Sequence, residues 1–85
     1  MCGIVGITSS RNVSTSILSS LKKLEYRGYD SAGISTLENG VINEVKCLGR
    51  VEELEKNFLK TKSQGQVGIG HVRWATHGIP STVNA

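Results

Sequence analysis

The spacing of apolar residues along the chain predicts four strands and two helices. Short apolar runs and alternating patterns favour strands at 2–7, 31–37, 41–48 and 67–73, the first of them largely buried. Apolar residues three and four positions apart favour helices at 13–26 and 51–60. The order of strand, helix, hairpin, helix and strand predicts an α+β domain, with helices packed against a mainly antiparallel sheet.

The ends and buried faces of the two helices can also be predicted. Asn12 is suited to cap the first helix, and Gly28 is suited to a left-handed conformation after its end. The inner face of the first helix is expected to comprise Ile17, Leu18, Leu21 and Leu24, followed by Glu25. The inner face of the second is expected to comprise Val51, Leu54, Phe58 and Leu59.

A hairpin is predicted between the two middle strands. Asn39 and Gly40 form the strongest short-range hairpin signal, because both central residues of a type I′ turn take positive φ angles. In the strand that follows, Cys47 shares a face with Val41 and Val45. We therefore expect the Cys47 side chain to be a small packed hydrophobic group rather than a reactive thiol.

The predicted sheet lacks partners on one side. If helices cover one face of the four strands, a sheet edge and the other sheet face remain uncovered, and such edges favour association. The residues at 79–85 do not form an element that would close the fold. We therefore interpret the sequence as part of a larger domain.

Length and charge exclude several classes of protein. The 85 residues suffice for one small domain, and the net charge of +3 is not arranged with aromatic residues in a basic stripe, so we expect no nucleic-acid partner. The apolar run at 2–7 is far shorter than the roughly 20 residues of a membrane span, so we expect no membrane partner. Two cysteines without a signal peptide favour reduced thiols and a cytoplasmic location.

The second residue of the chain is a candidate nucleophile. If Met1 is removed, Cys2 carries a thiol and a free α-amine on one residue. The α-amine has an ordinary pKa of about 7.7–8.0 and can accept the proton of the thiol near neutral pH. Gly3 and Gly6 beside it are expected to let a substrate lie close to the first strand.

Two polar stretches are further candidates for function. The stretch at 25–33 reads on its own as an ordinary helix end followed by a loop. In the stretch at 71–78, Arg73 is suited to hold a carboxylate, Trp74 to cover a small zwitterion, and Thr76 and His77 to donate hydrogen bonds. His71 and His77 with Cys2 match no compact metal-ligand spacing, so we expect neither a metal nor another cofactor.

Three stretches together resemble a known family. They are Cys-Gly-Ile-Val-Gly at 2–6, Glu-Tyr-Arg-Gly-Tyr-Asp-Ser-Ala-Gly at 25–33 and Arg-Trp-Ala-Thr-His-Gly at 73–78. In this order and at these separations they resemble the class II glutamine amidotransferases. The resemblance implies an N-terminal-nucleophile (Ntn) hydrolase-like αββα sandwich, two stacked antiparallel sheets between helices, of which residues 1–85 are the first part.

The resemblance also implies a role for particular residues. Cys2 attacks the side-chain amide of L-glutamine and releases ammonia, while Arg73, Thr76 and His77 bind the glutamine. Trp74 lies at the mouth of an ammonia channel, and Arg27 lies near the nucleophile. In the branch of the family that the chain resembles, the ammonia passes to a separate sugar-isomerase domain that acts on fructose 6-phosphate.

Parts of the family pattern are missing from the chain. The Asn-Gly pair of the oxyanion hole and the acidic residue that holds the α-amine of glutamine belong beyond Ala85, since Asn39 and Gly40 are better explained as a hairpin. The sugar-isomerase domain is missing too. We expect an incomplete amidotransferase domain that is inactive alone. The alternative is a non-enzymatic remnant of a split or decayed coding sequence, or a piece that acts by association with a second chain.

Overall fold

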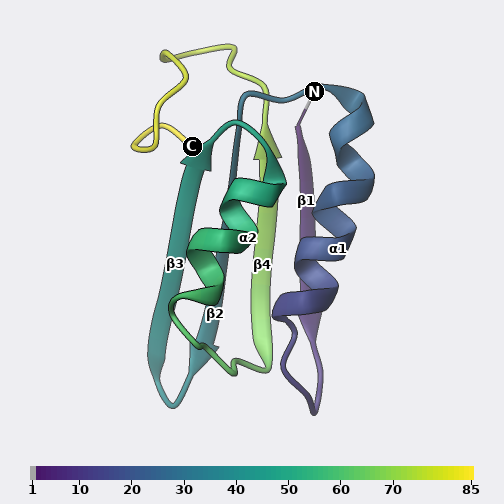
Figure 1. The fold of residues 1–85 in the computed structure, drawn as a ribbon, viewed down its shortest axis with the longest axis vertical. Helices are drawn as coiled ribbons and strands as arrows, with labels where there is room; N and C mark the ends of the chain where they lie inside the picture. The colour runs from purple at the N-terminus through teal and green to yellow at the C-terminus, as the bar shows by residue number, and fades with distance from the viewer. Residues whose placement is uncertain (1) are drawn as a thin grey trace.

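A computed structural model describes residues 2–85, except for the side chain of Arg27. The elements are β1 (Gly3–Thr8), α1 (Ser14–Leu24), the 3₁₀ turn η1 (Glu25–Arg27), β2 (Ser31–Glu38), β3 (Val41–Leu48), α2 (Val51–Leu59) and β4 (Val67–Arg73). Both helices lie on the same face of the sheet (Figure 1). The predicted α+β class and the order of the elements are confirmed.

The four strands form one antiparallel sheet in the order β1-β4-β2-β3. The last strand in sequence therefore lies between the first and the second. Gly3 is paired with Val72, and Ser31 is paired with Arg73. The start of β1, the end of β4 and the start of β2 consequently meet at one end of the sheet, although they are far apart in sequence.

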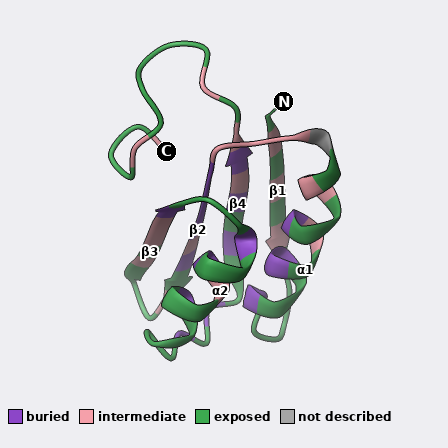
Figure 2. Ribbon diagram, turned by 45° about the horizontal axis from the view of Figure 1, so that its top comes forward, coloured by how far each residue is buried: buried purple, intermediate pink, exposed green. Residues whose placement is uncertain are grey.

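The hydrophobic core lies between the helices and the sheet (Figure 2). Its buried members are Val13, Ile17, Leu18, Leu21, Ala32, Ile34, Cys47, Val51, Leu54, Phe58 and Val72. Each helix supplies residues spaced three or four positions apart, as an amphipathic helix does when one face packs on a sheet. Cys47 is buried among them, so its predicted packing role is confirmed.

Helix α1 lies directly against the backbone of β4. A Cβ atom added to Gly70 would come within 2.6 Å of Ile17 Cγ2, and one added to Gly68 within 2.7 Å of Ile17 Cδ1. Real Cβ atoms do not approach other heavy atoms so closely. The two glycines therefore provide the space that the Ile17 side chain fills.

The predicted ends of the first helix need correction. Helix α1 ends at Leu24, and the chain continues through the tighter turn η1. At its other end α1 begins at Ser14 with Val13 as the N-cap residue, so Asn12 is not the cap, although its Oδ1 atom accepts a hydrogen bond from the backbone N–H of Ser14 at 2.9 Å. Gly28 has a positive φ of 81°, but its ψ of 134° is extended. It therefore redirects the chain into β2 rather than forming a left-handed helical cap.

Two predictions of burial were wrong. Leu59 was expected on the inner face of the second helix but is 64% exposed, because it is the last residue of α2 and lies past the edge of the core. Strand β1 was expected to be largely buried, yet its residues alternate between half-buried and exposed. Ile4 is 81% exposed, since β1 is an edge strand and one face of the sheet has no helix.

The sheet face opposite the helices, here called the open face, carries a set of exposed apolar side chains. They are Ile4, Leu37, Ile42, Leu48, Val67 and Ile69. The C-terminal residues reach this face at Lys46, whose ammonium group donates hydrogen bonds to the carbonyl oxygens of Val83 and Ala85, each at 3.1 Å. The predicted uncovered face is thus present. Within residues 2–85, neither α1 nor α2 has the length and apolar character to cross a membrane.

Candidate active site

The thiol of Cys2 lies against the backbone of Trp74. The N–H of Trp74 donates a hydrogen bond to Cys2 Sγ at 3.4 Å, and Sγ lies 3.8 Å from the carbonyl oxygen of the same residue. Cys2 is exposed to solvent. This contact follows from the sheet, because the start of β1 is paired with the end of β4. The structure therefore brings together the stretches at 2–6 and 73–78, two of the three that carry the family resemblance.

The guanidinium group of Arg73 is held by the turn that follows β4. Its Nη2 atom donates hydrogen bonds to the carbonyl oxygens of His77 and, at 3.2 Å, Gly78. Its Nη1 atom is buried and has no hydrogen-bond partner among the described residues. Since arginine offers several donors in a fixed planar array, Arg73 is oriented at one nitrogen and free at the other.

The indole of Trp74 connects the stretch at 73–78 to the stretch at 25–33. A Cβ atom added to Gly28 would lie 3.4 Å from Cζ3 of the indole and 3.6 Å from its Cε3. The ring therefore rests against the backbone of Gly28, while Trp74 as a whole stays 52% exposed. A glycine is suited to this position because it adopts the positive φ of 81° and leaves room for the ring.

Asp30 holds this end of the sheet together. Its backbone N–H donates to the carbonyl oxygen of Arg73 at 2.7 Å, and its carbonyl oxygen accepts from the N–H of Gly49 at 3.0 Å. Its carboxylate Oδ2 accepts a short hydrogen bond from the N–H of Ala75. No separate role was predicted for Asp30 from the sequence, although its place inside the stretch at 25–33 is a signal that could have identified it.

The other predicted site residues make fewer contacts that the structure describes. Thr76 and His77 are exposed in the turn after β4, and His77 contacts Arg73 through its backbone carbonyl oxygen. The side chain of Arg27 lies outside the described parts, as does Met1. Gly3 does not leave space for a substrate on the helix side of the sheet, because a Cβ there would come within 2.8 Å of Leu24 Cδ1. That prediction is corrected: Gly3 accommodates α1.

Tyr29 connects the same stretch to the second helix. The backbone N–H of Val51, at the start of α2, donates to the Tyr29 hydroxyl oxygen at 2.8 Å. Burial raises the pKa of Tyr29 above its ordinary value, Glu25 raises it further, and the hydrogen bond from Val51 opposes the rise. Tyr29 therefore stays protonated and caps α2, and Arg50 and Glu25 form an ion pair at 3.7 Å beside it.

The two cysteines differ in their surroundings. Burial raises the pKa of the Cys47 thiol above its ordinary value, and the carboxylate of Glu53 adds to the rise. Cys47 is therefore a protonated, buried thiol at neutral pH, whereas Cys2 is exposed and receives a backbone N–H. Because the thiolate is the nucleophilic form of cysteine, this difference favours Cys2 as the reactive residue.

His71 lies on the open face, next to the site on the same strand. A Cβ atom on Gly33 would come within 2.5 Å of the imidazole Cε1, so the ring lies over Gly33. Burial lowers the pKa of His71 below 6.5, Lys46 and Arg73 lower it further, and Glu44 opposes them. Among residues 2–85, no three His, Cys, Asp or Glu side chains are grouped so that they could hold a metal ion.

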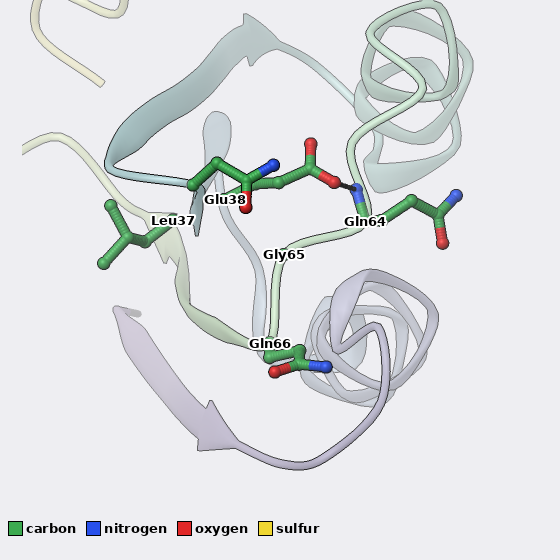
Figure 3. A pocket seen from close by; sticks show the side chains of 6 residues that line it. Leu37, Glu38, Gln64, Gly65 and Gln66 are labelled. Carbon is green, nitrogen blue, oxygen red and sulfur yellow. Dashed lines mark hydrogen bonds between the residues drawn. The ribbon is translucent and has the colours of Figure 1, made fainter.

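A pocket of about 290 Å³ lies at the far end of the sheet from Cys2, and Figure 3 shows it from close by. It is lined by Leu37, Glu38, Asn39, Gln64, Gly65 and Gln66. Leu37 is paired with Val67, at the opposite end of the β2–β4 ladder from the Ser31–Arg73 pair. A carboxylate oxygen of Glu38 accepts a hydrogen bond from the backbone N–H of Gln64 at 3.1 Å. The pocket is therefore separate from the candidate site.

Comparison with known proteins gives a consistent result. No family model matches the chain. The chain is 52% identical, over all 85 residues, to the glutamine–fructose-6-phosphate aminotransferases (isomerizing) of Clostridium acetobutylicum and Pyrococcus horikoshii. It is 51% identical over the same length to the enzyme of that name from Bartonella henselae. Each match includes the whole of this chain but 14% of the relative.

These matches confirm the resemblance to the class II glutamine amidotransferases. More narrowly, the chain is similar to the N-terminal part of the glutamine–fructose-6-phosphate aminotransferases.

Proposed function

We propose that the chain supplies the nucleophile and part of the glutamine-binding site of a glutaminase. The observation that carries the proposal is the contact of the exposed Cys2 thiol with the Trp74 N–H, one residue from the partly unpartnered guanidinium of Arg73. A nucleophile and a carboxylate-binding cation on neighbouring strands match the two ends of glutamine. The names of the relatives support glutamine as the substrate.

In the proposed reaction the Cys2 thiolate attacks the side-chain amide carbon of glutamine. A carbon–sulfur bond forms, the carbon–nitrogen bond breaks, and the nitrogen leaves as ammonia after taking up a proton. Water then hydrolyses the thioester to glutamate and restores the thiol. The base for the first step is the α-amine of Cys2, which requires removal of Met1, a residue outside the described part of the chain.

Arg73 is proposed to bind the α-carboxylate of glutamine. Its buried Nη1 lacks a partner within the described part of the chain, and an unpaired buried donor is costly unless a ligand pairs with it. Thr76 and His77, exposed in the same turn, are proposed to complete that part of the pocket. Trp74 is proposed to lie at the exit for ammonia, and Arg27 near the thiol.

The open face supports a larger domain around the site. Six apolar side chains exposed on one sheet face are suited to packing against a second sheet, about 10 Å away, as in a sandwich of two sheets. The chain spans 14% of its relatives' length, so a protein as long as those relatives has room for the rest of such a domain. We propose an Ntn-type αββα sandwich, with this four-stranded sheet as one of its two layers.

In the whole enzyme, the released ammonia is proposed to pass to a sugar-isomerase domain and to aminate fructose 6-phosphate. That domain and the oxyanion donors belong to the part of the protein beyond residues 1–85. The chain alone is therefore proposed to be inactive with glutamine, since a single missing oxyanion donor costs about 10²–10³ in kcat.

A chimera tests the proposed function. Residues 1–85 replace the matching segment of the Clostridium acetobutylicum relative, and ammonia release from glutamine is measured with Cys2→Ala and Cys47→Ala as a matched pair. We expect release in the chimera and in Cys47→Ala, and none in Cys2→Ala. Intact-mass measurement of the same protein should show that Met1 is absent. A folded chimera without activity, or equal activity in the Cys2→Ala variant, would contradict the proposal.

A second candidate role is favoured by the open face alone. The chain is then a piece that acts by association with another chain carrying the complementary sheet. Mixing the 85-residue chain with the remaining segment of the relative, produced separately, tests this role. Ammonia release that appears only in the mixture, and requires Cys2, would support association. Release in the single-chain chimera but not in the mixture would contradict it.

A further inference from the structure

Asp30 makes three hydrogen bonds, two to the end of β4 and the turn after it and one to Gly49, which follows β3. Its N–H is bonded to the end of β4 at Arg73, its carbonyl oxygen to Gly49, and its carboxylate to the N–H of Ala75. Of these contacts, the first two are ordinary backbone pairings at the edge of a strand. The third is made by the side chain and fixes the turn in which Trp74 lies.

We propose that Asp30 is a positioning residue for the nucleophile, a role that rests on the proposed function of Cys2. The Asp30 carboxylate holds the N–H of Ala75 and thus the peptide plane that follows Trp74, while the backbone N–H of Asp30 holds the carbonyl oxygen of Arg73, in the plane that carries the Trp74 N–H. The Trp74 N–H is thereby directed at Cys2 Sγ, at 3.4 Å. A backbone N–H directed at sulfur stabilises the thiolate over the thiol, because the bond to the charged form is the stronger one.

The environment of the carboxylate supports a positional role over a merely stabilising one. Oδ2 accepts the bond from Ala75, while Oδ1 is buried and accepts no hydrogen bond within the described residues. A carboxylate with one unpaired buried oxygen is a costly way to hold a turn, since a neutral acceptor avoids much of the desolvation. The carboxylate is explained if its charge-assisted bond to Ala75 N–H fixes the turn more firmly than a neutral acceptor does.

The turn after β4 is held through two parts of Trp74, its indole ring and its backbone. Trp74 is held by its ring against Gly28 and by its backbone through the Asp30–Ala75 bond. Gly28 and Asp30 lie two residues apart, so one short segment controls both the ring and the peptide plane. The N–H of Trp74 consequently has little freedom to turn away from the thiol.

Alkylation of the intact 85-residue chain with iodoacetamide tests the proposal without glutamine. Peptide mass spectrometry follows Cys2 and Cys47 separately in the wild type, Asp30→Ala, Asp30→Asn and the matched control Glu38→Ala. Glu38 likewise accepts a backbone N–H through its carboxylate, but at the far end of the sheet. Cys2 is already exposed, so its alkylation rate reports the thiolate rather than access.

We expect Asp30→Ala to slow the alkylation of Cys2 about threefold to tenfold, the worth of one hydrogen bond, with Cys47 unchanged. Asp30→Asn keeps a weaker, neutral acceptor for Ala75 and should slow the alkylation of Cys2 less than Asp30→Ala does, and Glu38→Ala should match the wild type. An unchanged Cys2 rate in Asp30→Ala, or an equal change in Glu38→Ala, would overturn the proposal.

Unfolding by Asp30→Ala is recognised as rapid alkylation of the buried Cys47. In that case Asp30→Asn and the hydrogen exchange of the Ala75 amide decide. An Ala75 amide that is protected in the wild type, together with slower alkylation of Cys2 in a folded Asp30→Asn variant, supports the proposal. An unprotected amide in the wild type, or an unchanged Cys2 rate in Asp30→Asn, overturns it. These measurements do not involve ammonia release. An inactive chimera with a positive alkylation result would reject the glutaminase and leave the positioning intact, and the reverse result would reject the positioning alone.

Discussion

The indole ring of Trp74 lies over the backbone of Gly28, at a residue whose φ of 81° most side chains cannot adopt. The contact joins the Tyr-Arg-Gly-Tyr-Asp segment to the Arg-Trp-Ala-Thr-His segment at the end of the sheet where Cys2 is found. Since the chain contains a single tryptophan, its fluorescence reports this contact directly.

Gly28→Ala is expected to disturb Trp74 as well as the backbone. The new methyl group would meet the indole at 3.4 Å and would also force a side chain into an unfavourable conformation, which costs about 1–3 kcal/mol. We expect a changed emission maximum and faster acrylamide quenching. Gly40→Ala is the matched control, because Gly40 has a similar φ of 77° but no heavy atom within 4 Å of the added carbon. If both variants change the fluorescence equally, the contact with Gly28 does not hold Trp74.

Gly70→Ala should destabilise the fold by overpacking. The added methyl group would come within 2.6 Å of Ile17 Cγ2, and α1 is packed too closely on β4 to move away freely. Overpacking of this kind costs about 1–3 kcal/mol in the free energy of unfolding. Gly6→Ala is the control on the neighbouring strand, where the nearest atom is 3.9 Å away. Urea unfolding followed by circular dichroism should show the loss in Gly70→Ala alone, and equal midpoints for the two variants would contradict the packing argument.

The elements of the fold could be predicted because they depend on local signals. The Asn39-Gly40 turn and the apolar spacing of the helices specify the hairpin and both helices from a few neighbouring residues. The burial of Leu59 and of β1 was predicted wrongly for a different reason. Periodicity identifies an apolar face, but it cannot show that Leu59 lies past the end of the sheet or that β1 is an edge strand.

The candidate site could be predicted in part. Cys2, Arg73 and Trp74 were identified from their chemistry and from the family resemblance, and the structure brings them together. Asp30 could not be assigned a role, because its contact with Ala75 depends on β4 lying between β1 and β2. Strand order of this kind is set by pairing between distant segments, which a single sequence does not display.

The open face should make the isolated chain associate in solution. Ile69 is 60% exposed at its centre, flanked by the other apolar residues of that face. Each Å² of apolar surface removed from water contributes about 25 cal/mol, so association that covers several such side chains is favourable. We expect Ile69→Thr to shift size-exclusion elution towards the monomer. Leu59→Thr is the control, because Leu59 is similarly exposed, at 64%, but lies at the end of α2. A monomeric wild type, or an equal shift in Leu59→Thr, would show that the open face does not drive association.

The half-buried position of His71 should make the fold less stable in acid. Burial, with Lys46 and Arg73, lowers the pKa of His71 below 6.5, while Glu44 opposes them. Between the lowered folded-state pKa and the unfolded value of 6.5, the unfolded chain binds more protons than the folded chain. The contribution of His71 is therefore fully present above pH 6.5 and is lost as the pH falls through the folded-state pKa.

Urea midpoints measured from pH 7.5 to pH 5 at a dilute chain concentration test this pH dependence. We expect the midpoint of the wild type to fall over this range and that of His71→Gln to fall less. His77→Gln, which removes the chain's other histidine from an exposed turn, should behave like the wild type. Carboxylates that titrate towards the acid end are common to the three proteins, so the difference between them isolates the imidazole. If the midpoint of His71→Gln falls as far as that of the wild type, the imidazole does not couple folding to pH.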